Sequence, residues 1–387
     1  MVCPHDFPLP TGLLCLGPDP HHMSTLFSEL SLREKTSSNR VMVSPMCQYS
    51  CDDRDGRATD WHLVHLGSRA VGGAGIVMTE ATAVEPRGRI SPEDLGIWND
   101  DHVEALEPIT RFITNQGSLP AIQLAHAGWK GSTVRPRDGH DTLHPNDGGW
   151  PVAGPTTDSF PYDRAVPEIE RLEHDDIDAV VDAFGRAAER AVEAGFRIVE
   201  VHAAHGYLLH QFLSPVTNTR EDDYGGDFEG RTRLTRETTA AVCEAVPDDI
   251  PVFVRLSATD WLPDHESWTV EQSIRLTDRL AEMGVDLVDV SSGGISPDSY
   301  PEYQGPNYQL PLAERIRTET ESDVAVGTVG GITTPEQAEA IVANDRADLV
   351  IVGREYLRDP YFTLRAAAAL DVDGVEGPPQ YRGVFQG

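Results

Sequence analysis

The sequence predicts an α/β protein folded as a (β/α)8 TIM barrel with extended loops at the C-terminal face. The prediction rests on the number of short apolar runs, on their composition, and on the amphipathic segments between them. The runs are rich in Val and Ile and continuously apolar, as parallel strands buried on both faces are. They are Val41–Met46, Gly75–Ala83, Leu119–Ala125, Phe196–Val201, Pro251–Leu256, Leu287–Val290, Val324–Gly327 and Leu349–Val352. Eight strands that each precede a helix, in a chain of more than about 250 residues, match this barrel.

Amphipathic segments between these runs predict the outer helices. Asp175–Ala194 carries Ala, Val and Phe on one face and Asp, Glu and Arg on the other, which is typical of a helix that covers a core. Val270–Met283 and Thr334–Ala343 have the same character. The latter opens with Thr334 followed by Pro335, a favourable cap and first helical residue.

A doubly wound parallel sheet is the alternative architecture. Such a sheet would carry a Gly-x-Gly-x-x-Gly turn after its first strand. The first strand here leads instead to Cys47, Gln48 and Tyr49. The sequence therefore favours the barrel.

Two long segments interrupt the alternation of strands and helices. Gly131–Glu173 follows the third strand and Leu208–Gly230 follows the fourth. Both leave from the C-terminal face, so we expect both to wall a substrate pocket. No linker separates a second domain, so residues 23–387 are predicted to form one domain. Residues 1–22 are predicted to be disordered, or to be a mis-assigned extension before a start at Met23.

The composition restricts the partners and the compartment. The formal net charge is −32, and Lys35 and Lys130 are the only lysines. The acidic residues are spread along the chain, which indicates a solvated acidic surface adapted to high salt and makes nucleic acid and anionic membranes poor partners. The five cysteines form no disulfide framework or Cys-x-x-Cys pair, which predicts a reducing cytoplasm. No apolar run approaches the roughly 20 residues that span a bilayer.

The stretch from Phe196 to Tyr207 is where we expect the chemistry. An apolar strand runs directly into His202, His205 and Tyr207, and active sites of parallel α/β folds lie at such strand ends. Two neutral imidazoles can donate to one oxygen anion, and a phenol can give up a proton. The set suits protonation of a carbon next to a carbonyl. The alternative interpretation is a structural histidine pair packed under a loop.

The other strand ends predict a phosphate-bearing cofactor. Gly330 and Gly331 follow the seventh strand, and Gly353 and Arg354 follow the eighth. Barrels commonly bind phosphate between these two loops. The ring of such a cofactor would then lie over the remaining strand ends.

Three side chains at those strand ends could meet the ring. Gln123 can pair with the edge of a planar heterocycle. Arg255 lies in an apolar strand, and burying its positive charge is costly unless an anion pairs with it. We expect this anion to be a reduced flavin; the alternative interpretation is a neighbouring carboxylate. Cys47 could tune a flavin's redox potential or be an inert small hydrophobe.

At these residues the sequence resembles the Old Yellow Enzyme family of FMN-dependent ene-reductases, in particular its thermophilic-like class with the bacterial xenobiotic reductases. The resemblance extends over about residues 25 to 382. The motifs that carry it are Ser44-Pro-Met-Cys-Gln-Tyr49, Ile122-Gln-Leu-Ala-His-Ala-Gly128, His202-Ala-Ala-His-Gly-Tyr207, Phe212-Leu-Ser-Pro215 with Asn218 and Arg220, Asp223-Tyr-Gly-Gly226, and Val352-Gly-Arg354.

The resemblance implies an FMN-containing barrel that NAD(P)H reduces and that passes hydride to the β-carbon of an α,β-unsaturated carbonyl. Tyr207 would donate the proton, and His202 and His205 would bind the carbonyl oxygen. Tyr49 would also face the substrate. The residues that would bind FMN by position are Ser44, Pro45, Met46, Cys47, Ala81, Gln123, Arg255, Gly353 and Arg354.

This sequence departs from the class in three places. Trp129 replaces the usual arginine, which puts the pocket rim in doubt. The class favours dimers and tetramers, often with a C-terminal arginine in the neighbouring subunit's site. The matching pattern is one residue short here, at Arg382. The iron–sulfur motif of the longer relatives is absent.

Two other functions remain as alternatives. A metal-dependent barrel hydrolase could use His202, His205 and His210 as ligands. A flavin-binding protein without turnover is the second.

Overall fold

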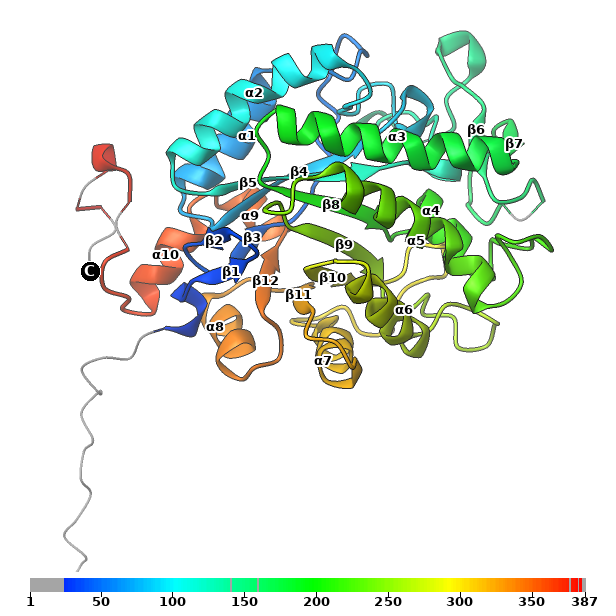
Figure 1. The fold of residues 1–387 in the computed structure, drawn as a ribbon. Helices are drawn as coiled ribbons and strands as arrows, with labels where there is room; N and C mark the ends of the chain where they lie inside the picture. The colour runs from blue at the N-terminus through cyan, green and yellow to red at the C-terminus, as the bar shows by residue number, and fades with distance from the viewer. Residues whose placement is uncertain (1–23, 140, 159, 376, 382, 385–387) are drawn as a thin grey trace, which may run out of the picture.

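A closed barrel of eight parallel strands forms the centre of the molecule (Figure 1). The computed structural model describes residues 24–384 except 140, 159, 376 and 382. The barrel strands are β3 (Val41–Val43), β4 (Ile76–Ala83), β5 (Leu119–Ala125), β8 (Ile198–Ala203), β9 (Val252–Ser257), β10 (Leu287–Ser291), β11 (Ala325–Val329) and β12 (Leu349–Val352). Pairing of Val350 with Val41 and of Ile351 with Met42 closes the barrel between β12 and β3. The predicted fold class is confirmed, with each predicted strand at its place in the chain.

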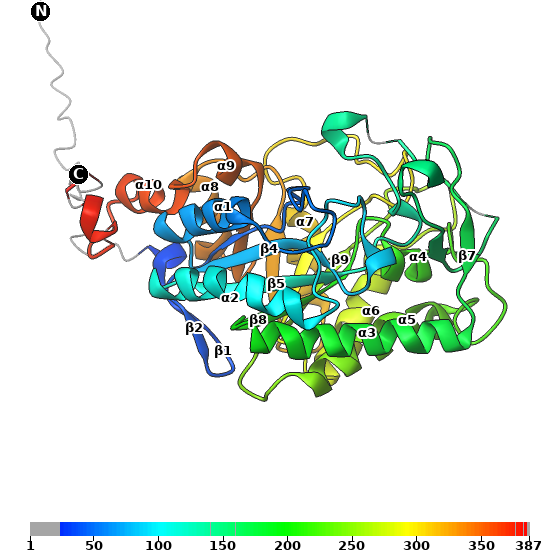
Figure 2. The same cartoon turned by 90° about the horizontal axis from the view of Figure 1, so that it is seen from above.

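Helices surround the barrel (Figure 2). The longer ones are α1 (Asp60–Val71), α2 (Asp100–Asn115), α3 (His174–Glu193), α5 (Phe228–Ala245), α6 (Val270–Glu282), α7 (Leu310–Glu319), α8 (Pro335–Ala343) and α10 (Phe362–Ala369). α3, α6 and α8 lie within one residue of their predicted bounds. At the start of α8, the Thr334 side chain accepts a hydrogen bond from the Gln337 amide, which confirms the predicted cap.

The core has two layers because each strand is apolar on both faces. Side chains such as Val77, Val199 and Val254 pack between the barrel and its helices. Met78 and Phe253 belong to a second cluster inside the barrel. Burial on both faces explains why the strands read as continuous apolar runs rather than as alternating ones.

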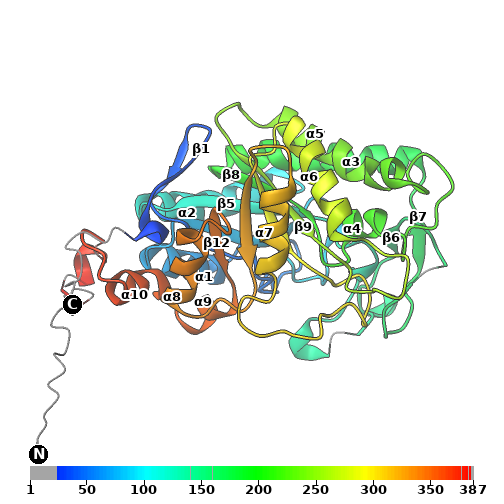
Figure 3. The ribbon, with the colours of Figure 1, turned by 90° about the horizontal axis from the view of Figure 1, so that it is seen from below.

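A hairpin of β1 (Leu30–Leu32) and β2 (Lys35–Ser37) was not predicted from the sequence (Figure 3). Leu30 and Leu32 join the cluster inside the barrel. The hairpin therefore covers the end of the barrel opposite the candidate site. Strands of three residues are too short to show a period of two, which is why the pattern missed them.

The first strand is shorter than predicted. β3 ends at Val43 rather than at Met46, because Pro45 has no amide hydrogen to donate to a ladder. The Ser44 amide still donates to the Val352 carbonyl at 2.9 Å. The segment after Ser44 is consequently free to turn across the C-terminal face of the barrel.

Both long interruptions leave from the C-terminal ends of their strands. The first contains β6 (Val152–Gly154) and β7 (Ile169–Arg171), which pair in a small parallel sheet. The second begins with α4 (Leu208–Leu213), a short helix that contacts β6. Figures 2 and 3 place this sheet and α4 at the end of the molecule opposite α10. Neither the small sheet nor α4 was predicted from the sequence.

Two predictions about the whole chain have different outcomes. Residues 1–22 lie outside the described residues, so the prediction for them stays a prediction. Among the described helices, none is long and apolar enough to cross a bilayer.

Candidate active site

His202 and His205 meet at the end of β8. His202 is the fifth residue of the strand. His205 and Gly206 follow in the left-handed region, with φ of 58° and 72°. This turn brings the Nδ1 atom of His205 to 3.4 Å from the Nε2 atom of His202, with the ring centroids 5.2 Å apart. The spacing of three residues thus places both imidazoles in one site, as predicted.

Both imidazoles are neutral around pH 7. Burial, and then the charge of Arg255, hold the pKa of each histidine well below 6.5. The Nε2 atom of His205 lies 2.7 Å from the Ser291 hydroxyl. The Nδ1 atom of His202 is buried without a hydrogen-bond partner among the described residues. An unpartnered buried nitrogen is a position that a bound ligand would satisfy.

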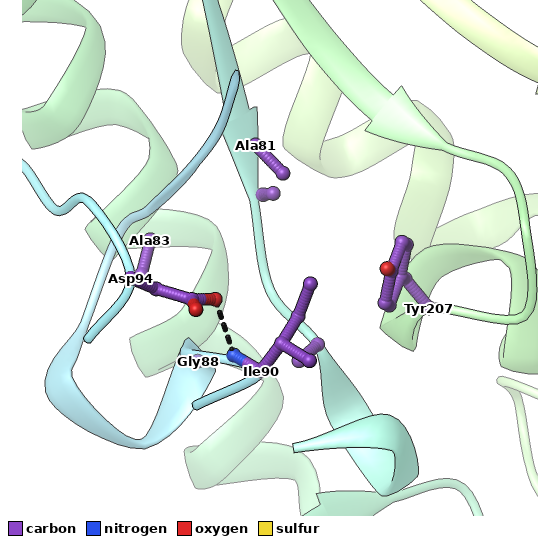
Figure 4. A pocket seen from close by; sticks show the side chains of 8 residues that line it. Ala81, Ala83, Gly88, Ile90, Asp94 and Tyr207 are labelled. Carbon is purple, nitrogen blue, oxygen red and sulfur yellow. Dashed lines mark hydrogen bonds between the residues drawn. The ribbon is translucent and has the colours of Figure 1, made fainter. Parts of the chain in front are cut away.

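Tyr207 adds a phenol to this pair. Its ring centroid is 5.1 Å from that of His202, and it faces Ala81 and Asp94 across a small cavity (Figure 4). Burial raises the pKa of Tyr207 well above 10, so the phenol holds its proton until a stronger base forms beside it. Asp94 was missed from the sequence; burial raises its pKa to about 6, and it accepts from the Ile90 amide at 2.7 Å.

The predicted phosphate residues line one cavity of about 350 Å³. Gly330, Gly331, Gly353 and Arg354 all contribute, and Arg255 reaches the same space from β9. Gly330 and Gly331 have φ of 119° and 68°, which only glycine adopts without strain. Backbone amides, the guanidinium groups of Arg354 and Arg358 in the cavity lining, and the absence of a side chain over the turn suit a phosphate dianion.

A polar layer inside the barrel lies beside this cavity. The Gln123 amide donates to Glu200 at 2.7 Å, and Arg255 pairs with Asp289 at 3.1 Å. The alternative interpretation of Arg255, an ion pair with a neighbouring carboxylate, is therefore correct. Arg255 nevertheless still lines the predicted cofactor cavity, so the ion pair anchors it there.

Glu200 and Asp289 were missed, although each stands as a lone carboxylate in an apolar strand. That isolation was the available signal, because a buried charge needs a partner. Burial and the charge of Asp289 raise the pKa of Glu200 to about 8. The positive charge of Arg255 thus stabilises two carboxylates in this layer, those of Asp289 and Glu200.

The segment after β3 supplies the other predicted residues. Cys47 is half-buried, and burial, then Asp94 and Glu80, raise the pKa of its thiol well above 9. Cys47 therefore stays a thiol. Tyr49, at φ of 51°, also has its pKa raised by burial. Glu80 on β4 fixes the segment by accepting from the Gln48 amide at 3.0 Å.

Trp129 and Lys130, which follow β5, were not expected where the structure places them. Trp129 is fully buried and packs against Gly154 of β6, so it underlies the pocket wall rather than forming its rim. Lys130 was not predicted as a site residue, and it lies in the site beside His205 and Tyr207. Arg382 lies outside the described residues, so its assignment stays a prediction.

The comparison with known families agrees with this geometry. The sequence model of the NADH:flavin oxidoreductase / NADH oxidase family matches residues 25–373. The chain belongs to this family. Within it, the chain is 45% identical to an NADPH dehydrogenase of Listeria monocytogenes over 359 residues, which is 93% of this chain and 98% of the relative. It is 43% identical to an NADPH dehydrogenase of Geobacillus thermodenitrificans over 358 residues, 92% of this chain and 98% of the relative.

Solved structures of several reductases share the barrel. Morphinone reductase in complex with tetrahydroNAD is 26% identical, with a TM-score of 0.70 over 94% of both chains. A 2-naphthoyl-CoA reductase complex is also 26% identical, with a TM-score of 0.80 over 89% of this chain and 52% of the other. The Old Yellow Enzyme homologue of Zymomonas mobilis, at 24% identity and a TM-score of 0.72, shows the same fold.

The predicted membership of the Old Yellow Enzyme family is therefore confirmed. The protein is an NAD(P)H-dependent flavin oxidoreductase with FMN as its cofactor. The metal-hydrolase alternative is not favoured: the Nδ1 atom of His210 accepts from the Gly206 amide at 2.8 Å, and its Nε2 atom pairs with Asp260 at 2.9 Å. Within the described ranges, no three His, Cys, Asp or Glu side chains are grouped to hold a metal.

Proposed function

We propose that this flavin oxidoreductase reduces the carbon–carbon double bond of α,β-unsaturated aldehydes and ketones. The observation that carries the proposal is the meeting of His202, His205 and Tyr207 in one site, with the ring centroids of the latter two 5.2 Å and 5.1 Å from that of His202. Burial favours neutral imidazoles and a protonated phenol there. When bound, FMN accepts hydride from NAD(P)H and passes it to the β-carbon of the substrate. The side chains of this protein must then bind the carbonyl and deliver a proton.

His202 and His205 bind the carbonyl oxygen in this proposal. A neutral imidazole donates one N–H hydrogen bond, and two such donors stabilise the negative charge that grows on the oxygen as the β-carbon accepts hydride. Donors fixed in advance in a dry site contribute strongly, because they need not reorganise during the reaction. The short distance between the two rings allows both to reach one oxygen atom.

Tyr207 gives its phenolic proton to the α-carbon. The raised pKa of Tyr207 keeps the phenol protonated before hydride arrives. The carbanion-like α-carbon is a far stronger base, so the proton moves once that charge has formed. Tyr49, from the segment after β3, lines the same substrate space in this proposal.

The cofactor-binding assignments follow the cavity and the segment after β3. Gly330, Gly331 and Arg354 would hold the phosphate, and Gln123 and Arg255 would meet the edge of the ring. Arg255 would supply positive charge beside the pyrimidine of the flavin. The further predicted contacts are Ser44, Pro45, Met46, Cys47, Ala81 and Gly353.

Replacing Gly331 with alanine should weaken FMN binding about tenfold or more. The added Cβ would lie 2.5 Å from the Gly305 carbonyl oxygen at φ of 68°, and strain of this kind costs about 1–3 kcal/mol. The turn must shift, which displaces the amides from the phosphate. FMN affinity is measured by fluorescence titration of the apoprotein.

Gly117→Ala is the matched control. Gly117 has φ of 88° and open space around its Cβ position, so it carries the same backbone strain away from the site. We expect lower stability with unchanged FMN affinity. Equal FMN affinity in Gly331→Ala and the native protein would contradict the phosphate assignment.

A homodimer or homotetramer, and a location in the cytoplasm, complete the proposal. The relatives' class supports an assembly in which Arg382 reaches the neighbouring site. Sedimentation of the holoenzyme, alone and as Arg382→Ala, tests the assembly and the contribution of this residue.

The experiment that tests the function is an anaerobic titration in high salt. Purified protein should show a flavin spectrum, bleach on addition of NADPH, and recover its colour on addition of cyclohexenone. Colour that bleaches but does not return with any of a panel of enones and enals would refute the ene-reductase proposal. A protein that never bleaches would instead support the flavin-binding alternative.

A further inference from the structure

Lys130 is a charged residue of the site that the proposed function leaves without a role. It ends a single helical turn, Gly128–Lys130, directly after β5. Of the 31 Lys and Arg residues, only Lys35 and Lys130 are lysines. Lys35 lies on the β1–β2 hairpin at the other end of the barrel and pairs with Asp249. Lys130 therefore lies in the candidate site of a chain in which every other Lys or Arg residue except Lys35 is an arginine.

The ammonium group of Lys130 joins two loops. Its Nζ atom donates to the His205 carbonyl at 2.7 Å and to the Gly294 carbonyl at 3.2 Å. These backbones are in direct contact, since a Cβ atom on Gly294 would lie 2.8 Å from the Cα atom of His205. Two carbonyl oxygens that converge repel each other, and a cation between them removes the repulsion.

The turn that Lys130 holds is a strained one. His205 is a non-glycine residue at φ of 58°, a conformation that costs about 1–3 kcal/mol and persists only when its surroundings enforce it. The His205 ring reaches His202 and Ser291 from this conformation. The contact of Lys130 with the His205 carbonyl is one of the interactions that enforce it.

The same ammonium group faces the rings of two tyrosines. Its Nζ atom is 5.2 Å from the ring centroid of Tyr207 and 5.3 Å from that of Tyr162, within the range of cation–π attraction. Tyr162 comes from the first long interruption, and its hydroxyl donates to the Gly206 carbonyl at 2.9 Å. Lys130 is therefore enclosed by the turn, by Tyr207 and by the interruption.

We propose that Lys130 is a positioning residue: its ammonium group fixes the His205–Gly206 turn against Gly294, and its charge stabilises the phenolate that Tyr207 becomes on losing its proton. The inference rests on the proposed function. In this step the O–H bond of Tyr207 breaks, a C–H bond forms at the α-carbon of the substrate, and Lys130 keeps its protons. Solvent water then returns a proton to Tyr207.

The proposal predicts a pH dependence. Burial of the ammonium, and then the charge of Arg164, lower the pKa of Lys130 to about 8, so the cation is present below that pH and lost above it. The other groups that face it titrate elsewhere. From the β8 turn, burial lowers the pKa of both histidines and raises that of Tyr207. From the interruption, burial raises the pKa of Tyr162, and Arg164 stays cationic.

Two carboxyl groups near the barrel mouth share this pKa of about 8, Glu80 and Glu200. They bond to the Gln48 amide and to Gln123 respectively, not to Lys130. A pH effect of Lys130 must therefore disappear when Lys130 alone is replaced. This requirement separates it from both carboxyl groups.

The test compares Lys130→Met with Lys35→Met in the FMN-loaded enzyme. The first readout is phenolate binding, measured by titrating the oxidised enzyme with 4-hydroxybenzaldehyde. The second is the rate at which cyclohexenone reoxidises the reduced enzyme between pH 6 and 9.5. We expect Lys130→Met to keep its FMN, to bind the phenolate at least tenfold more weakly, and to lose the fall in rate above pH 8. Lys35→Met should behave as the native enzyme does.

A second variant, Lys130→Gln, keeps amide donors for the two carbonyls without the charge. It should bind the phenolate better than Lys130→Met and still lack the alkaline fall. The inference is overturned if both variants retain that fall, or if both bind the phenolate as the native enzyme does. If the native enzyme itself is not reoxidised by enones, the proposed function fails, while the phenolate titration still decides the role of Lys130.

Discussion

Replacing Tyr207 with phenylalanine is expected to slow reoxidation by cyclohexenone about 10²–10⁴-fold, the usual contribution of a positioned general acid. Without the phenol, the α-carbon must take its proton from water that is not positioned for the transfer. The reduction by NADPH needs no proton from this residue and should proceed at nearly the native rate. Anaerobic stopped-flow absorbance follows the two half-reactions separately.

Tyr356→Phe is the matched control for this variant. Tyr356 is a fully buried tyrosine on α9 (Arg354–Arg358), and its hydroxyl bonds to that of Thr363 at 2.5 Å. Its replacement should lower stability by about 1 kcal/mol, the net value of one hydrogen bond, and leave both half-reactions unchanged. Native-like reoxidation in Tyr207→Phe would remove Tyr207 from the proton-donor role.

Replacing both His202 and His205 with alanine should produce the second large effect. The loss of one preorganised donor to a developing oxyanion typically costs about 10²–10³ in rate, so the double variant should turn over enones at least that much more slowly. Phenolate ligands, which place a charged oxygen where the substrate carbonyl would lie, should bind at least tenfold more weakly. Spectral titration of the oxidised enzyme measures that affinity.

The pH dependence of phenolate binding gives a further check on the histidines. Because the pKa of both imidazoles lies well below 6.5, they remain neutral donors from pH 6 upward. Affinity should therefore rise with pH as the ligand ionises, without a decrease as pH passes 6.5. A decrease there would show that a charged imidazolium binds the ligand. His265→Ala, which removes an exposed histidine, is the control and should change neither readout.

Most of the fold could be predicted because its signals are local. Each barrel strand is a run of apolar residues. In each of the three predicted helices, apolar residues recur at the spacing of a helical turn and form the face that packs on the barrel. The meeting of His202, His205 and Tyr207 in one place could also be predicted, because all three lie at or just after the C-terminal end of β8. A parallel barrel brings all its strand ends to one face, so residues far apart in sequence, such as Gln123 and Arg354, could be assigned to one site before their distances were known.

The missed features depend on contacts between distant segments. β1, β2, β6 and β7 have three residues each, so only their partners stabilise them as strands. Glu200 and Asp289 were visible as isolated carboxylates, but their partners lie on neighbouring strands. Arg255 had two interpretations on sequence alone, and the structure shows that the ion pair and the place in the cavity are compatible.

The barrel, and the face of the barrel at which the candidate site lies, follow from the amino-acid sequence alone, because strand burial and strand ends are properties of short stretches. The protonation states of the site and the left-handed backbone conformation of His205 could be read from the three-dimensional structure but not from the sequence. Those depend on burial and on charges brought from other strands, such as Arg255 beside the histidines. The position of Lys130 belongs to the same class, since its two carbonyl partners come from loops after different strands.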